Sequence, residues 1–346
     1  MDNDSLVTIP IVIHVIFGDE DQNVDDERLL GQIRRLNEDF RRLNPDTALT
    51  PALFKDVAAD TKVEFCLAEI DPWSESTKGI TRTQTFVNEI GLTQRYWQSA
   101  LGGQDAWDQN RYLNIWVCEI VEDGSIAGFA EAAKMEPAGA EGIVIDYRYF
   151  GILTSGMSSF GGGRTLTHET GHWLGLSHIW GVETGCAIDD GIEDTPLQLD
   201  RYRGCPTYPQ QSCGSEDMFM NFMDLTDDAC MNLFTEGQKE RMRRVLFTFK
   251  PNLWIQDLCE NPTTSSLSPD LQRMHLFPNP TRGHLRISLG NLTLNHRIQI
   301  RNLQGQMLSY RQLDEGISIS DFPPGLYLLT LETGDQSKTF KIIKTD

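Results

Sequence analysis

Apolar and polar residues follow two different periods along the first two thirds of the chain. Residues 8–17 form a nearly continuous β-branched, apolar run, which is typical of a buried strand. In residues 25–43 apolar positions recur at helical spacing among charged ones, which predicts an amphipathic helix. Further strands are predicted at 62–68, 112–118, 126–132 and 142–148, and further helices at about 164–176 and 235–249. This order predicts an α/β layer followed by an irregular half, with Thr235 and Gln238 as the capping pair of the last helix.

The pattern changes after residues 260–270, ENPTTSSLSPD, which are rich in Ser, Thr and Pro and are not expected to pack. Short alternating runs separated by turn residues follow, at 284–289, 297–303, 306–311, 316–320, 325–332 and 338–343. This pattern predicts a small all-β sandwich. We therefore predict a first domain over residues 1–258, a linker over 259–274 and a β-sandwich domain over 275–346.

Composition excludes two classes of partner. The 346 residues include 30 basic and 50 acidic ones, a net charge of −20, which argues against nucleic acid. No apolar run reaches the roughly eighteen residues that a transmembrane helix needs. Acidic residues, rather than a charged-then-apolar leader, open the chain, so we expect a signal peptide to be absent from it.

Four of the seven cysteines fall in a loop-rich stretch over 186–230, rich in Gly, Pro and Asp. These four are Cys186, Cys205, Cys213 and Cys230. No CxxC pair is present among them, which favours two disulfides and an extracellular setting over a zinc site formed by these cysteines. Their spacing alone leaves three disulfide connectivities open. Cys66, Cys118 and Cys259 have no partner in this scheme. Cys66 and Cys118 lie in predicted strands, where we expect buried thiols.

The motif with the most distinctive chemistry is HETGHWLGLSH, residues 168–178. His168 and His172 are four residues apart, so on a helix both imidazoles project from one face and can share a metal ion. Gly175 can adopt the left-handed conformation that ends the helix and brings His178 back as a third ligand. The fourth position of a tetrahedral zinc ion is then left for water. The sequence therefore predicts one catalytic zinc ion rather than a helix with surface histidines.

Hydrolysis of peptide bonds is the reaction that this ligand set favours. Zinc lowers the pKa of bound water to about 7 and polarises a carbonyl group. Glu169, beside the ligands, is placed to accept the proton of that water and to pass it to the leaving amine. Two alternatives stay open: a surface adhesin or binding module with a catalytically silent zinc site, and an enzyme for a small amide. Structural zinc sites usually have four protein ligands, which favours an enzyme.

The motif resembles the HExxHxxGxxH signature of the metzincin metalloproteases. MNFMDLTDDACMNLFT, residues 220–235, is similar to the methionine turn of the pappalysin (ulilysin-like) branch, which implies that Met223 is the turn methionine. The resemblance covers roughly residues 8–250. It implies an α/β (α+β) catalytic domain split by an active-site cleft, with the helix that carries the motif at the floor of the cleft.

The chain departs from this family at Leu225. Pappalysin-like enzymes usually carry a tyrosine two residues after the turn methionine, where it can hydrogen-bond the oxyanion. Leu225 has no donor, and loss of one such donor typically costs about 10²–10³ in rate. This departure motivates the alternative of a silent zinc site.

The loop CAIDDGIEDTP, residues 186–196, offers hard oxygen ligands of the kind that calcium prefers. They belong to Asp189, Asp190, Glu193, Asp194 and Thr195. Relatives of the pappalysin type bind calcium near this place, so the resemblance implies at least one structural calcium ion; a solvated acidic loop is the alternative. The same resemblance implies the disulfides Cys186–Cys213 and Cys205–Cys230.

Substrates are expected to be proteins or peptides. Asp227 and Asp228 follow the methionine turn, where metzincins build the wall of the pocket for the first residue after the cut. A carboxylate there would favour Arg or Lys, and ordinary surface aspartates are the alternative. The run 126–132 is either an edge strand that pairs with an extended substrate or an internal strand.

The end of the chain has a resemblance of its own. LFPNPTRGHLRISL, then GQML, then FPPGLYLLTLETGDQSKTFKIIKTD resemble the C-terminal sorting domain of the bacterial type IX secretion system over residues 275–346. This implies a Bacteroidetes-type bacterium, the secretion machinery as a partner, and a secreted or cell-surface location. Pappalysin-like enzymes are generally made with a pro-segment that blocks the zinc ion. The first core strand begins within about ten residues, so we expect that segment to be absent here.

Overall fold

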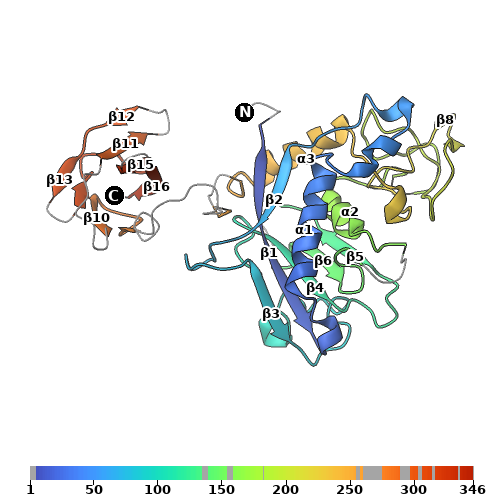
Figure 1. The fold of residues 1–346 in the computed structure, drawn as a ribbon, viewed down its shortest axis with the longest axis horizontal. Coiled ribbons are helices and arrows are strands. Elements are labelled where there is room, and N and C mark those ends of the chain that lie inside the picture. The colour runs from blue at the N-terminus through green and yellow to red at the C-terminus, as the bar shows by residue number, and fades with distance from the viewer. Residues whose placement is uncertain are drawn as a thin grey trace. The chain divides into compact units, whose positions relative to one another are not determined.

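The computed structural model describes residues 5–134, 139–153, 159–181, 183–254, 258–259, 275–288, 297–302, 306–313, 316–333 and 336–345. It divides into two compact units, residues 1–260 and residues 261–346 (Figure 1). The first unit extends through Cys259, a residue that the sequence analysis assigns to the linker. Most of the predicted linker lies outside the described residues.

A six-stranded sheet forms the centre of the first unit (Figure 1). Its strands are β1 (Val7–Phe17), β2 (Val63–Leu67), β3 (Ile80–Gln84), β4 (Leu113–Cys118), β5 (Gly128–Glu131) and β6 (Gly142–Asp146). The order is β2-β1-β4-β6-β5, and β3 pairs with the second half of the long β1. Every pairing is parallel except that of β5, which runs antiparallel to β6 at the edge of the sheet. β3 was not predicted, because its sequence ITRTQ has one apolar residue and is only partly buried.

Helices α1 (Asp26–Phe40) and α2 (Arg164–Trp173) contribute to one core with the sheet. Alternate strand residues such as Ile13 and Ile115 belong to that core, whereas Trp116 and Val144 belong to a second core. The sheet is therefore buried on both faces, which explains the nearly continuous apolar sequence of β1.

Helix α3 (Glu236–Phe249) begins with the capping box that the sequence predicts, formed by Thr235 and Gln238. Short elements occupy the connections of the first unit. They are the 3-10 segments η1 (Glu20–Gln22), η2 (Pro45–Leu49), η3 (Ala52–Phe54), η4 (Ser99–Leu101) and η5 (Asp228–Cys230), and the two-residue strands β7 (Gln211–Ser212) and β8 (Ser215–Glu216).

Three disulfides cross-link the first unit. Cys186 is bonded to Cys213 and Cys205 to Cys230, the two pairs that the family resemblance implies. The third bond joins Cys66 to Cys259, so the expectation of an unpaired thiol at Cys66 is wrong. Cys66 is only half-buried, and the chain returns beside it, where Glu69 N donates to Leu258 O. The two cysteines are 193 residues apart in sequence, so no local pattern relates them. Cys118 is a buried free thiol, as predicted.

Two four-stranded antiparallel sheets build the second unit. One has the order β13-β14-β10-β9 and the other β12-β11-β15-β16. Their bounds are β9 (His275–Phe277), β10 (His284–Ser288), β11 (Arg297–Asn302), β12 (Met307–Leu308), β13 (Arg311–Leu313), β14 (Gly316–Ser318), β15 (Gly325–Thr333) and β16 (Gln336–Lys344). Ile300, Leu329 and Ile317 belong to their shared core. Asn279, in the Pro-Asn-Pro turn, accepts from Ile343 N and donates to Lys341 O of β16. Among the described residues, no helix combines the length and apolar character that a membrane span requires.

Candidate active site

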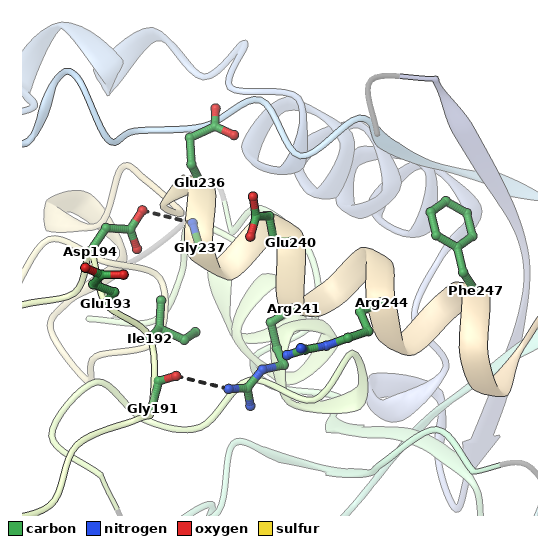
Figure 2. A pocket seen from close by; sticks show the side chains of 10 residues that line it. All are labelled: Gly191, Ile192, Glu193, Asp194, Glu236, Gly237, Glu240, Arg241, Arg244 and Phe247. Atoms are coloured by element: carbon green, nitrogen blue, oxygen red, sulfur yellow. Dashed lines mark hydrogen bonds between the residues drawn. The ribbon is translucent and has the colours of Figure 1, made fainter. Parts of the chain in front are cut away.

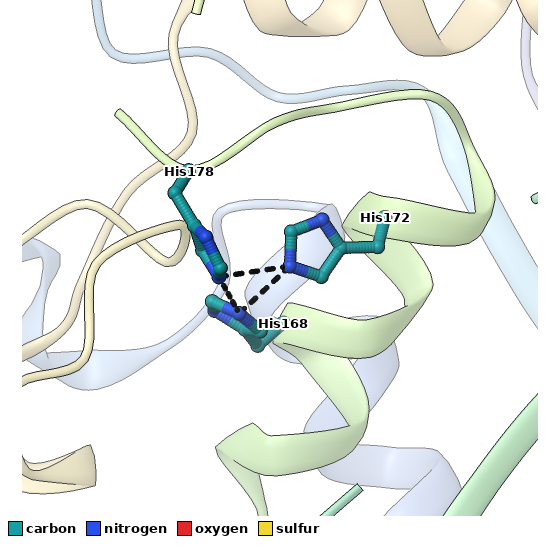
Figure 3. Close-up of side chains that lie close together, drawn as sticks. All are labelled: His168, His172 and His178. Carbon is teal, nitrogen blue, oxygen red and sulfur yellow. Dashed lines mark hydrogen bonds between the residues drawn. The ribbon is translucent and has the colours of Figure 1, made fainter. Parts of the chain in front are cut away.

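Three imidazoles converge at the C-terminal end of α2 (Figure 3). His168 and His172 project from consecutive turns of the helix, and Gly175, at φ +83°, turns the chain so that His178 faces both of them. Their Nε2 atoms lie 3.0, 3.1 and 3.2 Å apart. This is the one group of three metal-binding side chains in the part of the chain that the structure describes.

The proton positions on two of these rings are fixed by backbone carbonyls. His168 Nδ1 lies 2.7 Å from Phe222 O, and His172 Nδ1 lies 2.9 Å from Leu176 O. Since a carbonyl oxygen only accepts, both Nδ1 atoms carry the proton, and both Nε2 atoms present lone pairs to each other. Two lone pairs at 3.0 Å repel unless a cation lies between them.

The spacing and charge of the three nitrogens fit a zinc ion. Nitrogens bonded to one tetrahedral zinc ion at 2.0–2.1 Å lie about 3.3–3.4 Å apart, close to the observed separations. Burial lowers the pKa of all three imidazoles, that of His178 to about 4, and keeps the rings neutral at pH 7, as ligation requires. His178 also stacks on Trp180, with ring centroids 4.2 Å apart, which restricts its orientation.

Glu169 lies on the same helix, one residue after His168. It is 9% exposed, and its carboxylate makes no hydrogen bond or ion pair among the described residues. Burial raises its pKa to about 8. The side chain packs beside β5, where a Cβ on Gly128 would approach Glu169 Cγ to 3.1 Å. Glycine at that position therefore lets the helix and the edge strand approach each other.

The turn around Met223 packs against the helix that carries His168 and His172. Met223 is fully buried, and its sulfur packs against Gly171, between His168 and His172 in the helix. Met223 N donates to Asn221 Oδ1 at 2.9 Å. Asn221 and the carbonyl groups of Phe222 and Leu176 are absent from the site that the sequence predicts. Every residue has a carbonyl group, and no sequence signal marks which one will accept or which asparagine will hold the turn. Leu225 is half-buried and packs against the main core.

The acidic loop, residues 186–196, contains one aspartate that caps α3 and another that is buried. Asp194 accepts from Thr235 Oγ1 at 2.6 Å and from Gly237 N at 2.9 Å, so it caps α3 (Figure 2). Asp190 is buried; its Oδ1 accepts from Thr195 Oγ1 at 2.7 Å, whereas its Oδ2 has no hydrogen-bond partner among the residues that the structure describes. Burial raises the pKa of Asp190 to about 6. Asp189 is exposed and accepts from Gly191 N.

A cavity of about 840 Å3 lies between this loop and α3 (Figure 2). Arg241 reaches from α3 to the carbonyl oxygen of Gly191 at 3.1 Å on its wall. None of the three histidines lines the cavity, so it is separate from the histidine site.

Asp227 and Asp228 have different environments. The carboxylate of Asp228 is buried and accepts from Gly162 N at 2.8 Å and Arg164 N at 3.1 Å, so it caps the N-terminus of α2. Asp227 is half-buried, and its carboxylate makes no hydrogen bond or ion pair within the described ranges. Of the two, Asp227 is the one whose carboxylate is not engaged at the N-terminus of α2.

Comparison with known proteins relates the chain to one family. The peptidase M43 model, described as pregnancy-associated plasma protein-A, matches residues 99–247, and a secretion system C-terminal sorting domain matches residues 275–345. An extracellular metalloprotease of Arthroderma gypseum is 29% identical over 71% of this chain and 74% of its own length. Another, from Arthroderma benhamiae, is 26% identical over 70% and 79%. The structure of Tannerella forsythia mature mirolysin in complex with a cleaved peptide is 42% identical, with a TM-score of 0.69 over 74% of this chain and 99% of that one.

Proposed function

This chain belongs to the M43, or pappalysin, family of zinc metalloendopeptidases, and from that premise we propose that it cuts peptide bonds with Glu169 as the general base. The chain is a secreted metalloprotease with a type IX sorting domain. The observation that carries the proposal is the triangle of Nε2 atoms beside the buried carboxylate of Glu169, which has no protein partner within the described ranges.

In this mechanism His168, His172 and His178 would hold the zinc ion. When bound, zinc acidifies a water molecule and polarises the scissile carbonyl group. Glu169 would accept a proton from the attacking water and pass it to the leaving amine. The side chain suits this role because it is buried one residue after His168, and its carboxylate makes no hydrogen bond or ion pair among the described residues. Met223 and the Phe222 carbonyl keep the ligand helix and His168 in place.

We propose that the substrate lies extended along β5. This strand pairs with β6 on one side and is at the edge of the sheet, and it packs beside Glu169. Its outer backbone groups can therefore pair with an extended peptide. The relative mirolysin has been captured with a cleaved peptide, which supports a protein or peptide substrate here.

A preference for Arg or Lys after the cut rests on Asp227 in this proposal. Its carboxylate is half-buried and without a protein partner in the described segments, whereas that of Asp228 is engaged at the N-terminus of α2. A carboxylate in that state can pair with a guanidinium or ammonium group.

We also propose one structural calcium ion at the acidic loop. Asp190 Oδ2 is a buried oxygen without a hydrogen-bond partner in the described part of the chain, and Thr195 and Asp189 lie on the same loop. Calcium would satisfy that oxygen, with backbone carbonyl groups or water completing its coordination. Asp194 contributes less than the sequence suggests, because both of its oxygens already accept hydrogen bonds from α3 and its cap.

The test is cleavage of a denatured protein mixture, with the cut sites mapped by mass spectrometry. Parallel samples contain a zinc chelator, Glu169→Ala protein or Asp227→Asn protein. In the untreated sample we expect cuts that cluster before Arg or Lys. We expect no cuts with chelator or with Glu169→Ala protein, and a weaker preference for Arg or Lys with Asp227→Asn protein. Asp228→Asn serves as the matched control, since it should alter stability more than preference.

The opposite result would favour a different class of protein. If the untreated protein binds zinc in full but its cut pattern does not differ from those of the chelated and Glu169→Ala samples, metal-dependent proteolysis is contradicted. Leu225, which cannot donate a hydrogen bond, would then support an adhesin or binding module with a silent zinc site.

A further inference from the structure

Two buried side-chain amides connect the first turn of α3 to the turn below the zinc ligands. Gln238 and Asn221 are both fully buried. Asn221 Nδ2 donates to Gln238 Oε1 at 2.9 Å, and Gln238 Nε2 donates to Asn221 Oδ1 at 3.0 Å. The pair is therefore closed by two hydrogen bonds out of contact with water.

Backbone groups fix the orientation of each amide. Thr235 N donates to Gln238 Oε1 at 2.9 Å, and Met223 N donates to Asn221 Oδ1 at 2.9 Å. An N–H group needs an oxygen opposite it, so neither amide can rotate by half a turn without facing donor to donor. The capping box of α3 thus determines which atoms of Gln238 face Asn221.

The effect of the pair reaches a metal ligand through one peptide group. Asn221 directly precedes Phe222, whose carbonyl oxygen accepts from His168 Nδ1 at 2.7 Å. The Asn221 side chain also holds the backbone N–H of Met223, on the other side of Phe222. Any movement of the Asn221 side chain would therefore tilt the carbonyl group that orients His168.

We propose that Gln238 is a positioning residue for the zinc site: through Asn221 it holds the Phe222 carbonyl that aims His168 Nε2 at the metal. This inference rests on the zinc ligation proposed above. Glu and Gln both satisfy a capping box, because each offers an oxygen to the backbone N–H of the cap. Only Gln can also donate to Asn221 Oδ1, so the amide has a task beyond helix capping.

Gln238→Glu separates the two tasks. The variant keeps the acceptor for Thr235 N and for Asn221 Nδ2, but it places a carboxylate oxygen against Asn221 Oδ1. We expect zinc to transfer to a chromophoric chelator about tenfold faster from this variant than from the unchanged protein, since outer partners of ligating histidines typically affect metal affinity 10–100-fold. Asn221→Asp, which removes the other hydrogen bond of the pair, is expected to act in the same direction.

Leu246→Ala is the matched control for general destabilisation. Leu246 is a buried apolar residue of the same helix, and its truncation should lower the melting temperature without faster zinc release. A second readout is pH, because the carboxyl group introduced by Gln238→Glu can donate a hydrogen bond again once it is protonated. The ratio of release rates between Gln238→Glu and the unchanged protein should therefore shrink from about pH 8 to about pH 6.

Each other outcome contradicts the proposal. If Gln238→Glu and Asn221→Asp release zinc at the unchanged rate, or if Leu246→Ala releases it equally fast, Gln238 is a helix cap and no more. If the unchanged protein binds no zinc, the proposed function fails as well, and this result is distinguishable because it is seen before any variant is made.

Discussion

The sulfur of Met223 packs against Gly171, on the stretch of α2 that separates His168 from His172. A Cβ at position 171 would overlap that sulfur and would come within 3.5 Å of Leu176 Cδ1. Met223 is fully buried, and Asn221 holds its backbone, so the side chain has little room to withdraw. Glycine between His168 and His172 therefore allows the turn around Met223 to contact the helix.

Gly171→Ala should lower the free energy of unfolding by about 1–3 kcal/mol, the usual cost of overpacking a filled core. In a Met223→Ala background the same substitution should cost less, because the overlapping sulfur is gone. Urea denaturation of the four proteins measures the coupling, which we expect to exceed about 0.5 kcal/mol. Additive effects would show that the two residues do not interact.

Asp224 should make stability depend on pH. It is fully buried, and burial raises its pKa to about 6, above the value of about 3.9 in an unfolded chain. The folded state therefore binds this proton more tightly, and the contribution to stability falls as pH rises from about 4 to about 6. The difference in free energy of unfolding between the unchanged protein and Asp224→Asn should change by about 2–3 kcal/mol over that range. A constant difference would indicate that Asp224 is ionised throughout.

Lys250, at the end of α3, and Glu141, directly before β6, form a buried ion pair at 2.7 Å. Lys250→Met leaves a buried carboxylate without its partner and should cost about 3–5 kcal/mol of stability. Adding Glu141→Gln to that variant should recover a large part of the loss, because no unpaired charge then remains. Thermal and urea unfolding of the single and double variants test this. A double variant as unstable as the single one would assign the effect to packing instead.

The disulfides predict a simple pattern of thiol reactivity. Of the seven cysteines, six are in the bonds Cys66–Cys259, Cys186–Cys213 and Cys205–Cys230, and Cys118 is a buried thiol. An alkylating reagent should label no cysteine in the folded, non-reduced protein and one in the unfolded, non-reduced protein. Peptide mapping without reduction should identify that residue as Cys118. Label on Cys66 or Cys259 would contradict the bond between them.

The local parts of this site could be predicted from residue spacing. The interval between His168 and His172 equals about one helical turn, and Gly175 marks the reversal that returns His178. The capping box of Thr235 and Gln238 follows from the same kind of short-range rule and is present in the structure. These features depend on backbone geometry within a few residues, so the sequence specifies them.

Contacts between distant segments could not be predicted in this way. Strand β3 has a mostly polar sequence and is a strand because the second half of β1 offers it a partner. The Cys66–Cys259 bond depends on where the chain returns after α3, and the role of Asp228 as a cap depends on the approach of residues 162–164. A carboxylate can pair with a substrate cation or with the N–H groups at the start of a helix, and only the fold decides which is nearer.

By itself, the sequence determined the proposed ligand set and general base, the alternation of strands and helices, and the sorting domain at the end of the chain. These depend on residue identity and on the periods of helix and strand, which are local properties. The tertiary structure alone decided that the Phe222 carbonyl orients His168, that Asn221 and Gln238 are paired behind that carbonyl, and that Asp194 caps α3. Hydrogen bonds between segments form only where packing brings a donor within about 3 Å of an acceptor, and no residue's identity sets that distance in advance.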